Sequence, residues 1–310
     1  MKCLVAIIGP TAVGKTDLGI SVAQELGGEI INADSRQIYK LMDIGTAKPT
    51  IDQRNTVPHH LIDIIFPDEP YSVALYQKAA GESIADIQSR NRLPILLGGS
   101  GQYIWSLIED WSIPGIQPDS AFRQQMLRQA GESGSAELYE QLKGIDPETA
   151  GKILPNNIRR IIRALEIFHA TGQKPSQIRK KGKLPFPVLM IGLTAGREKL
   201  YELINSRTDR MIESGFVEEV SGLLKKGYTL ELPSMSSIGY RQIGMYLQNE
   251  INLEEAVRQI KFGTHRFARG QYAWFHLSDS RIKWFDVFDD IKEKIHYTIE
   301  TFLHDISSAE

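Results

Sequence analysis

The chain has 310 residues, 42% hydrophobic and 24% charged, and a formal net charge of −2 at pH 7. This length exceeds one typical domain, so we expect two domains or one domain with a large insertion. No apolar run approaches the ~20 residues of a membrane span, so membrane association is not expected. Residues 1–9 lead directly into the glycine-containing loop described below, so no signal peptide is expected. Cys3 is the only cysteine, which excludes an internal disulfide or cysteine-based zinc finger and predicts a cytoplasmic location.

The first expected element is a strand, "CLVAIIG", followed by the loop "PTAVGKT" and a helix. Gly9, Gly14, Lys15 and Thr16 fit G-x-x-x-x-G-K-[ST], the phosphate-binding loop. A strand, a glycine-containing loop and a helix N-terminus in this order make an anion site, because the first-turn N–H groups have no partners within the helix. The sequence therefore predicts that this loop binds a phosphate.

Three more strands are expected at "GEIINADS", at "RLPILLGGSG" and at "FPVLMIGLTA", which begins near residue 186. Helical stretches separate them, which predicts an α/β fold with a parallel sheet flanked by helices, like that of P-loop NTPases. Ligands bind at the carboxyl ends of such strands. Residues 34–37 and 98–102 are therefore expected to lie beside the phosphate loop.

Residues 116–186 are expected to form a helical insertion domain, with a catalytic core domain at 1–115 and 187–310. The segment 151–185 has a net charge of +8, because Glu166 is its only acidic residue. A polyanion is the favoured partner, and a solvated basic face is the alternative. The positive residues are Lys152, Arg159, Arg160, Arg163, Lys174, Arg179, Lys180, Lys181 and Lys183.

From residue 197 onward, helices are expected to dominate. One of them has two stripes with helical spacing. The stripe expected in the core comprises Val257, Ile260, Thr264, Phe267, Gln271 and Trp274. The other stripe, expected to be solvated or to face the polyanion, comprises Arg258, Lys261, His265 and Arg269.

The loop alone does not identify the reaction. A P-loop kinase normally has a strand-end Asp that holds Mg²⁺. Here "PILLGGS" ends in glycines, and Asp63 fits this role poorly because Pro58 and Pro67 enclose its segment. Asp34, which follows the second strand, is the carboxylate expected opposite the loop. It could hold Mg²⁺ through water or take a proton from a nucleophile, and the residue types leave both roles open.

Several longer blocks carry a specific resemblance. "GPTAVGKT", "INADSRQIYKLMDIGTAKP", "VPHHLID", "LLGGSGQYI", "RALE" followed by "TG", "GFVEEV" and "SIGYRQ" occur in this order. Together they resemble the tRNA dimethylallyltransferases, also called tRNA isopentenyltransferases, from residue 4 to about residue 275. The resemblance implies transfer of the dimethylallyl group from dimethylallyl diphosphate to the exocyclic amine of adenosine 37, beside the tRNA anticodon. Diphosphate is the leaving group.

The resemblance also implies roles for the donor site. Lys15 and the loop amides would neutralise charge on the departing diphosphate, and Thr16 would hold Mg²⁺. Arg207 matches an arginine associated with the diphosphate and is preferred to Arg210. The implied diphosphate site comprises Gly9, Pro10, Thr11, Ala12, Val13, Gly14, Lys15, Thr16 and Arg207.

On the acceptor side, the resemblance makes Asp34 the general base. Ser100 stands where the family usually has Thr and keeps the hydroxyl. The adenine has to be flipped out of the anticodon loop to react. The implied tRNA-binding residues are Asp34, Ser35, Arg36, Gln37 and Ser100 around the adenine, with Arg123, Arg159, Arg160, Ile161, Ile162 and Arg163 on the anticodon stem-loop.

The motif near the C-terminal end departs from the family pattern. "ARGQYAW" has Gly270 and Ala273 where an Arg and a Thr are usual, which weakens the expectation of phosphate contacts from that helix. Two alternative activities share the loop: an isopentenyltransferase that acts on free AMP, and a nucleotide kinase. The first would not need the basic insertion. A monomer is expected.

Overall fold

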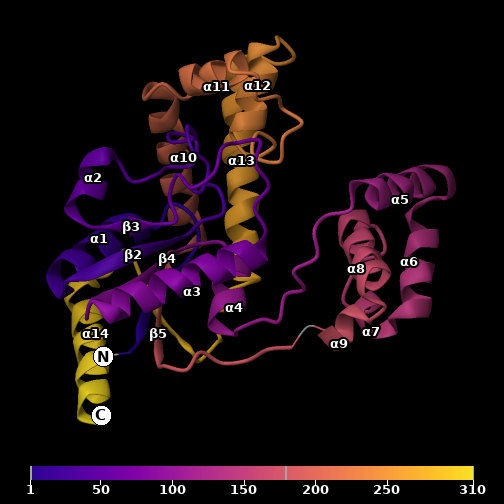
Figure 1. The fold of residues 1–310 in the computed structure, drawn as a ribbon. Coiled ribbons are helices and arrows are strands. Elements are labelled where there is room, and N and C mark those ends of the chain that lie inside the picture. The colour runs from indigo at the N-terminus through magenta and orange to yellow at the C-terminus, as the bar shows by residue number, and fades with distance from the viewer. Residues whose placement is uncertain (1, 179, 310) are drawn as a thin grey trace. The chain divides into compact units, whose positions relative to one another are not determined.

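The structure is a computed structural model that describes residues 2–178 and 180–309 (Figure 1). Arg179 of the basic segment lies outside the described residues. The chain forms two compact units, of which the second, Glu109–Lys183, is inserted between the two parts of the first, Met1–Ile108 and Leu184–Glu310. The helical insertion predicted at residues 116–186 overlaps this second unit.

Within the described residues, a six-stranded parallel sheet forms the centre of the first unit, in the order β3-β2-β4-β1-β5-β6. Strand β1 is buried along its whole length and pairs with β4 and β5, as expected for an apolar run inside a parallel sheet. The expected α/β fold is confirmed, and β3 and β6 are additions to it. The strands are β1 (Leu4–Ile8), β2 (Gly28–Ala33), β3 (His59–His60), β4 (Leu93–Gly98), β5 (Val188–Thr194) and β6 (Ile282–Asp286).

Helices cover both faces of this sheet. Val5 and Ile7 share one apolar cluster with Val22 of α1 and Ile299 of α14. Because side chains alternate along a strand, the remaining residues of β1 face the other side, where α3 packs against β2, β4 and α4. The helices around the sheet are α1 (Lys15–Leu26), α2 (Ile51–Thr56), α3 (Val73–Ser89), α4 (Gly101–Ile108) and α14 (Lys292–Ala309).

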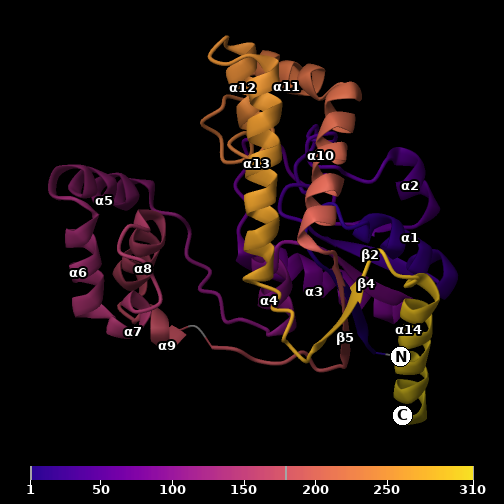
Figure 2. The ribbon, with the colours of Figure 1, turned by 180° about the vertical axis from the view of Figure 1, so that it is seen from behind.

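Four further helices belong to the first unit. The two long ones, α10 and α13, pack side by side, as both views show (Figures 1 and 2). α11 packs against α10 and α12, and α12 packs against α13. Their bounds are α10 (Arg197–Glu213), α11 (Phe216–Lys225), α12 (Tyr240–Leu247) and α13 (Leu253–Tyr272). None of the helices in the described parts of the chain has the length and apolar character that a membrane crossing requires.

The second unit is helical and has its own apolar core, to which α5, α6 and α8 contribute Met126, Leu142 and Leu165. Side chains cap its helices: Asp119 accepts from the backbone N–H of Phe122 at 2.9 Å, at the start of α5. The helices are α5 (Ser120–Ser133), α6 (Ser135–Ile145), α7 (Pro147–Ala150), α8 (Ile158–Thr171) and α9 (Pro175–Ile178).

Candidate active site

The phosphate loop lies between β1 and α1, and two of its glycines have backbone conformations that favour glycine. Gly9 has φ 146°, and a Cβ built on it would approach the backbone oxygen of Leu193 in β5 to 2.4 Å. Gly14 has φ 78° immediately before α1 begins at Lys15. A side chain at Gly9 would push the loop away from the sheet, so glycine allows the loop to pass close over β5.

Lys15 points its ammonium group back over the loop. Its Nζ donates a hydrogen bond to the carbonyl oxygen of Pro10 at 2.6 Å. Burial lowers the pKa of Lys15 to about 7, with Asp34 acting to raise it and Arg207 to lower it. The protein alone therefore compensates the positive charge of this side chain poorly. A bound anion would stabilise the charged form and raise the pKa of Lys15 again.

Two cavities open beside the loop. The loop cavity, of about 280 Å³, is lined by Thr11, Ala12, Gly14, Lys15, Thr16, Asp34, Gln37, Arg207 and Arg210, among others. The helix cavity, of about 530 Å³, is lined by residues that include Asp34, Ser35, Arg36, Ser100, Arg207, Phe267, Gln271 and Trp274. Asp34 and Arg207 line both, so they stand where the two cavities meet.

Asp34 follows the last residue of β2, and hydrogen bonds with Asn32 and Arg36 hold it in place. Its backbone N–H donates to Oδ1 of Asn32 at 3.0 Å, and Asn32 Nδ2 donates to the carbonyl oxygens of Asp34 and Leu61 at 3.1 and 3.0 Å. Oδ1 of Asp34 accepts from the backbone N–H of Arg36 at 2.8 Å. The carboxylate is thus oriented by short-range backbone contacts.

Arg207, on α10, lines both cavities, and Ser100, which follows β4, lines the helix cavity. Burial lowers the pKa of Arg207, while Asp34 acts to raise it. Arg210 is exposed and lines only the loop cavity, so the structure favours Arg207 as the more enclosed of the two. Ser100 Oγ accepts from the backbone N–H of Ser35 at 2.9 Å and donates to Ser35 Oγ at 3.2 Å. In this arrangement, Ser100 fixes the segment after Asp34.

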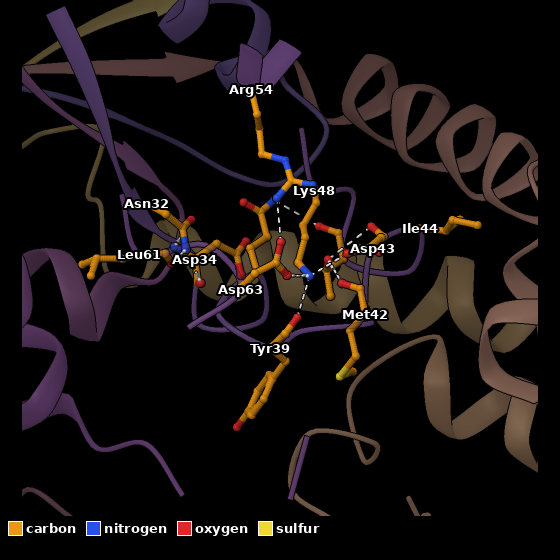
Figure 3. A network of polar contacts seen from close by, with 12 residues as sticks. Asn32, Asp34, Tyr39, Met42, Asp43, Ile44, Lys48, Arg54, Leu61 and Asp63 are labelled. Atoms are coloured by element: carbon orange, nitrogen blue, oxygen red, sulfur yellow. Dashed lines mark hydrogen bonds and ion pairs between the residues drawn. The ribbon is translucent and has the colours of Figure 1, made fainter. Parts of the chain in front are cut away.

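A buried cation supports the segment that carries Asp34 (Figure 3). The side chain of Lys48 is 1% exposed, and its Nζ donates to the carbonyl oxygen of Tyr39 at 2.5 Å, to Asp43 at 2.7 Å and to Asp63 at 2.5 Å. Arg54 pairs with the other oxygen of Asp63 at 2.6 Å. Asp63 therefore pairs with two cations, one at each of its carboxylate oxygens.

Glu219 of α11 holds the same segment from the other end. Its carboxylate accepts from the backbone N–H groups of Asp43, Ile44 and Gly45 at 2.9, 2.7 and 3.2 Å, and from the Tyr240 hydroxyl at 2.6 Å. One side chain thereby satisfies three successive amides in a turn that lines the helix cavity at Gly45. The "GFVEEV" block thus contributes to the shape of that cavity.

The stripe expected in the core runs along α13 and past its end to Trp274, and it is only partly buried. Ile260 and Gln271 are each 4% exposed, but Phe267 is 48% and Trp274 36% exposed. Both aromatic side chains line the helix cavity. Helical spacing shows which residues share a face, and here part of that face meets a cavity instead of protein. Gly270 also lines it, and a Cβ built there meets no atom within 4 Å.

The basic segment of the second unit contains an internal ion cluster. Glu166, whose side chain is 1% exposed, accepts from Arg123 at 2.8 Å through each of its oxygens, from Arg163 at 2.5 Å and from the backbone N–H of Asp119 at 2.8 Å. Arg123 and Arg163 therefore have a structural use, whereas Arg159 and Arg160 are exposed.

Two of the expected tRNA-binding residues have buried side chains. Ile161 and Ile162 are 0% and 5% exposed and belong to the core of the helical unit. They face away from solvent because the apolar side of α8 packs against α5 and α6. Their side chains are therefore not available to a partner, and a role for these two residues in tRNA binding stays a prediction.

The comparisons with known proteins identify the family of the chain. The family model "IPP transferase" matches residues 37–278, and the model "Isopentenyl transferase" matches residues 2–62. The tRNA dimethylallyltransferase of Roseiflexus sp. (strain RS-1) is 51% identical over 88% of this chain and 89% of its own length. That of Dehalococcoides mccartyi is 45% identical over 97% and 93%.

Solved structures of such enzymes are also similar over the full chain. The tRNA isopentenylpyrophosphate transferase of Bacillus halodurans is 40% identical with a TM-score of 0.74, covering 100% of this chain and 99% of that one. A eukaryotic dimethylallyltransferase acting on tRNA is 27% identical with a TM-score of 0.81, covering 100% and 80%. The chain therefore belongs to the IPP transferase family, together with the tRNA dimethylallyltransferases.

Proposed function

We propose that the protein transfers the dimethylallyl group from dimethylallyl diphosphate to the exocyclic amine of adenosine 37 in tRNA. The observation that carries this proposal is the meeting of two cavities at Asp34 and Arg207. One cavity is walled by a phosphate loop and the other by aromatic side chains. The dimethylallyl group can thus pass from a diphosphate in the loop cavity to a base in the helix cavity, beside the carboxylate of Asp34.

The loop cavity suits the leaving group. As the bond between carbon and the diphosphate oxygen breaks, negative charge grows on the diphosphate. Lys15 and Arg207 line this cavity, and preorganised positive groups of this kind stabilise the developing charge. The lowered pKa of Lys15 supports this role, because the diphosphate would supply the counter-charge that the protein does not.

The cavity residues also fit a magnesium ion. No group of three or more His, Cys, Asp and Glu side chains that could hold a metal occurs in the described ranges, so an all-protein cage does not fit. Mg²⁺ commonly uses one or two protein ligands with water and substrate phosphates. Thr16 would supply one oxygen, and the diphosphate and water would supply the others. The ion would add positive charge beside the leaving group.

A histidine in the loop cavity offers a hydrogen-bond acceptor to water around a bound ion or diphosphate. His59 lines it, and its Nδ1 is 2.8 Å from the carbonyl oxygen of Val57, so Nδ1 carries the proton. Burial lowers the pKa of His59, which favours the neutral ring. Its buried Nε2 is without a hydrogen-bond partner among residues 2–178 and 180–309. An acceptor in this state is suited to a water molecule.

The acceptor side follows from the same geometry. When the amine nitrogen bonds to the dimethylallyl carbon, Asp34 takes the proton that the nitrogen loses. Phe267 and Trp274 offer apolar, aromatic surface for the five-carbon group and for a flipped base, and bases stack readily on such side chains. Ser35, Arg36 and Gln37 supply polar groups along the two cavities.

In the second unit, the exposed Arg159 and Arg160 are the arginines of α8 best placed to contact the phosphates of the anticodon stem-loop. Phosphate contacts of this kind position an RNA without reading its sequence.

The proposal is tested by incubating the protein with labelled dimethylallyl diphosphate, Mg²⁺ and one of three acceptors: a tRNA with adenosine 37, the same tRNA with guanosine 37, or AMP. We expect label only in the first. Label in AMP would indicate an enzyme for the free nucleotide. No label in any acceptor, from a folded protein that binds diphosphate, would overturn the proposed reaction.

A further inference from the structure

One side chain of α13 connects two loops that are far apart in the sequence. Gln271 Oε1 accepts from the backbone N–H of Thr11, in the phosphate loop, at 2.8 Å. Its Nε2 donates to the carbonyl oxygen of Gly99, which follows β4, at 2.9 Å. The two partners are 260 and 172 residues away along the chain. The amide of one glutamine thus spans from the loop of the first cavity to the turn that carries Ser100.

The surroundings favour glutamine at this position. An N–H donor and a carbonyl acceptor face the two ends of the side chain, so they fix which end is oxygen and which is nitrogen. Gln271 is 4% exposed, and a buried amide without partners would be destabilising. A Cβ built on Gly99 would lie 2.3 Å from Nε2. Glycine at this turn therefore allows the glutamine to approach the backbone.

The bond to Thr11 has a consequence for the phosphate loop. The N–H of Thr11 is directed to the protein, so this amide fixes the loop and is not offered to a phosphate. The turn at Gly99 is fixed at the same time, and with it Ser100, whose hydroxyl bonds the segment after Asp34. Gln271 also lines both cavities.

We propose that Gln271 is a positioning residue that sets the separation between the phosphate loop and the Gly99–Ser100 turn. The proposal rests on the function proposed above, because that separation would align the leaving group with the incoming amine. Misplacing reacting groups by about 1 Å can lower a rate by ~10²-fold. Removing the two hydrogen bonds should therefore slow transfer much more than it weakens binding of tRNA.

The test compares Gln271→Met, which keeps the length of the side chain and removes both bonds, with Tyr272→Phe. The control removes one hydrogen bond from the next residue of the same helix, between the Tyr272 hydroxyl and Thr194 Oγ1 at 2.8 Å. For Gln271→Met we expect kcat to fall by about 10²-fold, with KM for tRNA within about threefold of the wild type. Tyr272→Phe should retain kcat within about threefold.

A second readout requires neither tRNA nor catalysis. Amide hydrogen exchange at Thr11, followed by NMR, should be faster in Gln271→Met than in the wild type or Tyr272→Phe. If Gln271→Met does not fold, Gln271→Glu replaces it: a carboxylate still accepts from Thr11 but cannot donate to Gly99, so exchange at Thr11 should stay slow while kcat falls.

Unchanged exchange at Thr11 in a folded Gln271→Met protein would overturn the proposal, as would a kcat within threefold of the wild type. A loss of kcat matched by an equal loss in Tyr272→Phe would also overturn it, because it would show only a general effect of the helix end. Failure of the proposed function has a different signature. The wild type would then transfer no dimethylallyl group, whereas exchange at Thr11 would still respond to Gln271→Met.

Discussion

Removing positive charge from α8 should have two separable effects, depending on where each arginine lies. Arg159 and Arg160 are exposed, so replacing both by Gln removes two groups available to RNA phosphates. Each lost phosphate contact reduces the slope of log K against log salt by roughly 0.7–0.9, so the double variant should lose about 1.4–1.8. Its stability should be close to that of the wild type, because neither side chain is buried.

Arg163→Gln should behave in the opposite way. It removes one of the three groups that satisfy the buried Glu166 and leaves the bidentate contact from Arg123. A buried charge that loses one hydrogen-bonding partner is destabilised by about 1–3 kcal/mol. We therefore expect a lower free energy of unfolding for the second unit and a salt slope close to that of the wild type.

The pH dependence of this cluster has a defined sign. Burial would raise the pKa of Glu166, but hydrogen bonds from Arg123 and Arg163 outweigh it and hold that pKa below its ordinary value. The cluster therefore stabilises the fold above the pKa of an unfolded glutamate, about 4.3, and this contribution is lost as pH falls through the lower, folded-state pKa.

Filter binding of tRNA between about 50 and 200 mM salt gives the slopes, and urea unfolding at neutral pH gives the stabilities. Arg163→Gln is the matched control for the double variant, because it lies on the same helix and removes the same type of charge. If Arg163→Gln flattened the salt slope without loss of stability, Arg163 would contact the RNA and would not be needed to satisfy Glu166. An unaltered slope in the Arg159 and Arg160 double variant would show that these two side chains do not contact RNA phosphates.

Three further predictions concern the first unit. Asp34→Asn should bind both substrates but turn over ~10²-fold more slowly, and a rate restored by excess Mg²⁺ would show that Asp34 mainly holds the metal. Binding of pyrophosphate near pH 8 should take up a proton at Lys15, since its pKa of about 7 rises beside the anion; calorimetry in two buffers should detect this uptake in the wild type and not in Lys15→Met. Gly270→Ala should raise the free energy of unfolding by roughly 0.5–1 kcal/mol, because a Cβ there meets no neighbour, and unchanged or lower stability in urea would contradict this.

The strands that the sequence revealed are those whose own residues carry the signal. β1 and β4 are continuous apolar runs, and such runs need no partner to be recognised. β3 has two residues and exists through its pairing with Ile30 and Ile31 of β2. β6 is only partly buried and follows a long helical region, so its alternation was too weak to stand out.

The parts of the site that the sequence missed depend on tertiary contacts. The spacing of Gln271 on a helix indicates a buried side, but its two backbone partners come from loops that only the fold brings together. Counting charges likewise treats Arg163 and Arg159 alike, although one meets a buried carboxylate and the other is exposed. Local motifs were enough to find the phosphate loop and Asp34, because each directly follows the end of a strand that is recognisable in the sequence.

The interrupted first unit has a consequence for synthesis on the ribosome. β1 lies between β4 and β5, but β5 begins at Val188, after the whole helical unit has been made. At ~5–20 residues per second, β1 would wait roughly 10–40 s for its second neighbour. During that time one edge of an apolar strand is unpaired, whereas the core of Glu109–Lys183 is already complete within its own segment. Ribosome-bound chains arrested before Val188 emerges should therefore show protease protection of the helical unit ahead of β1, and the reverse order would exclude this sequence of events.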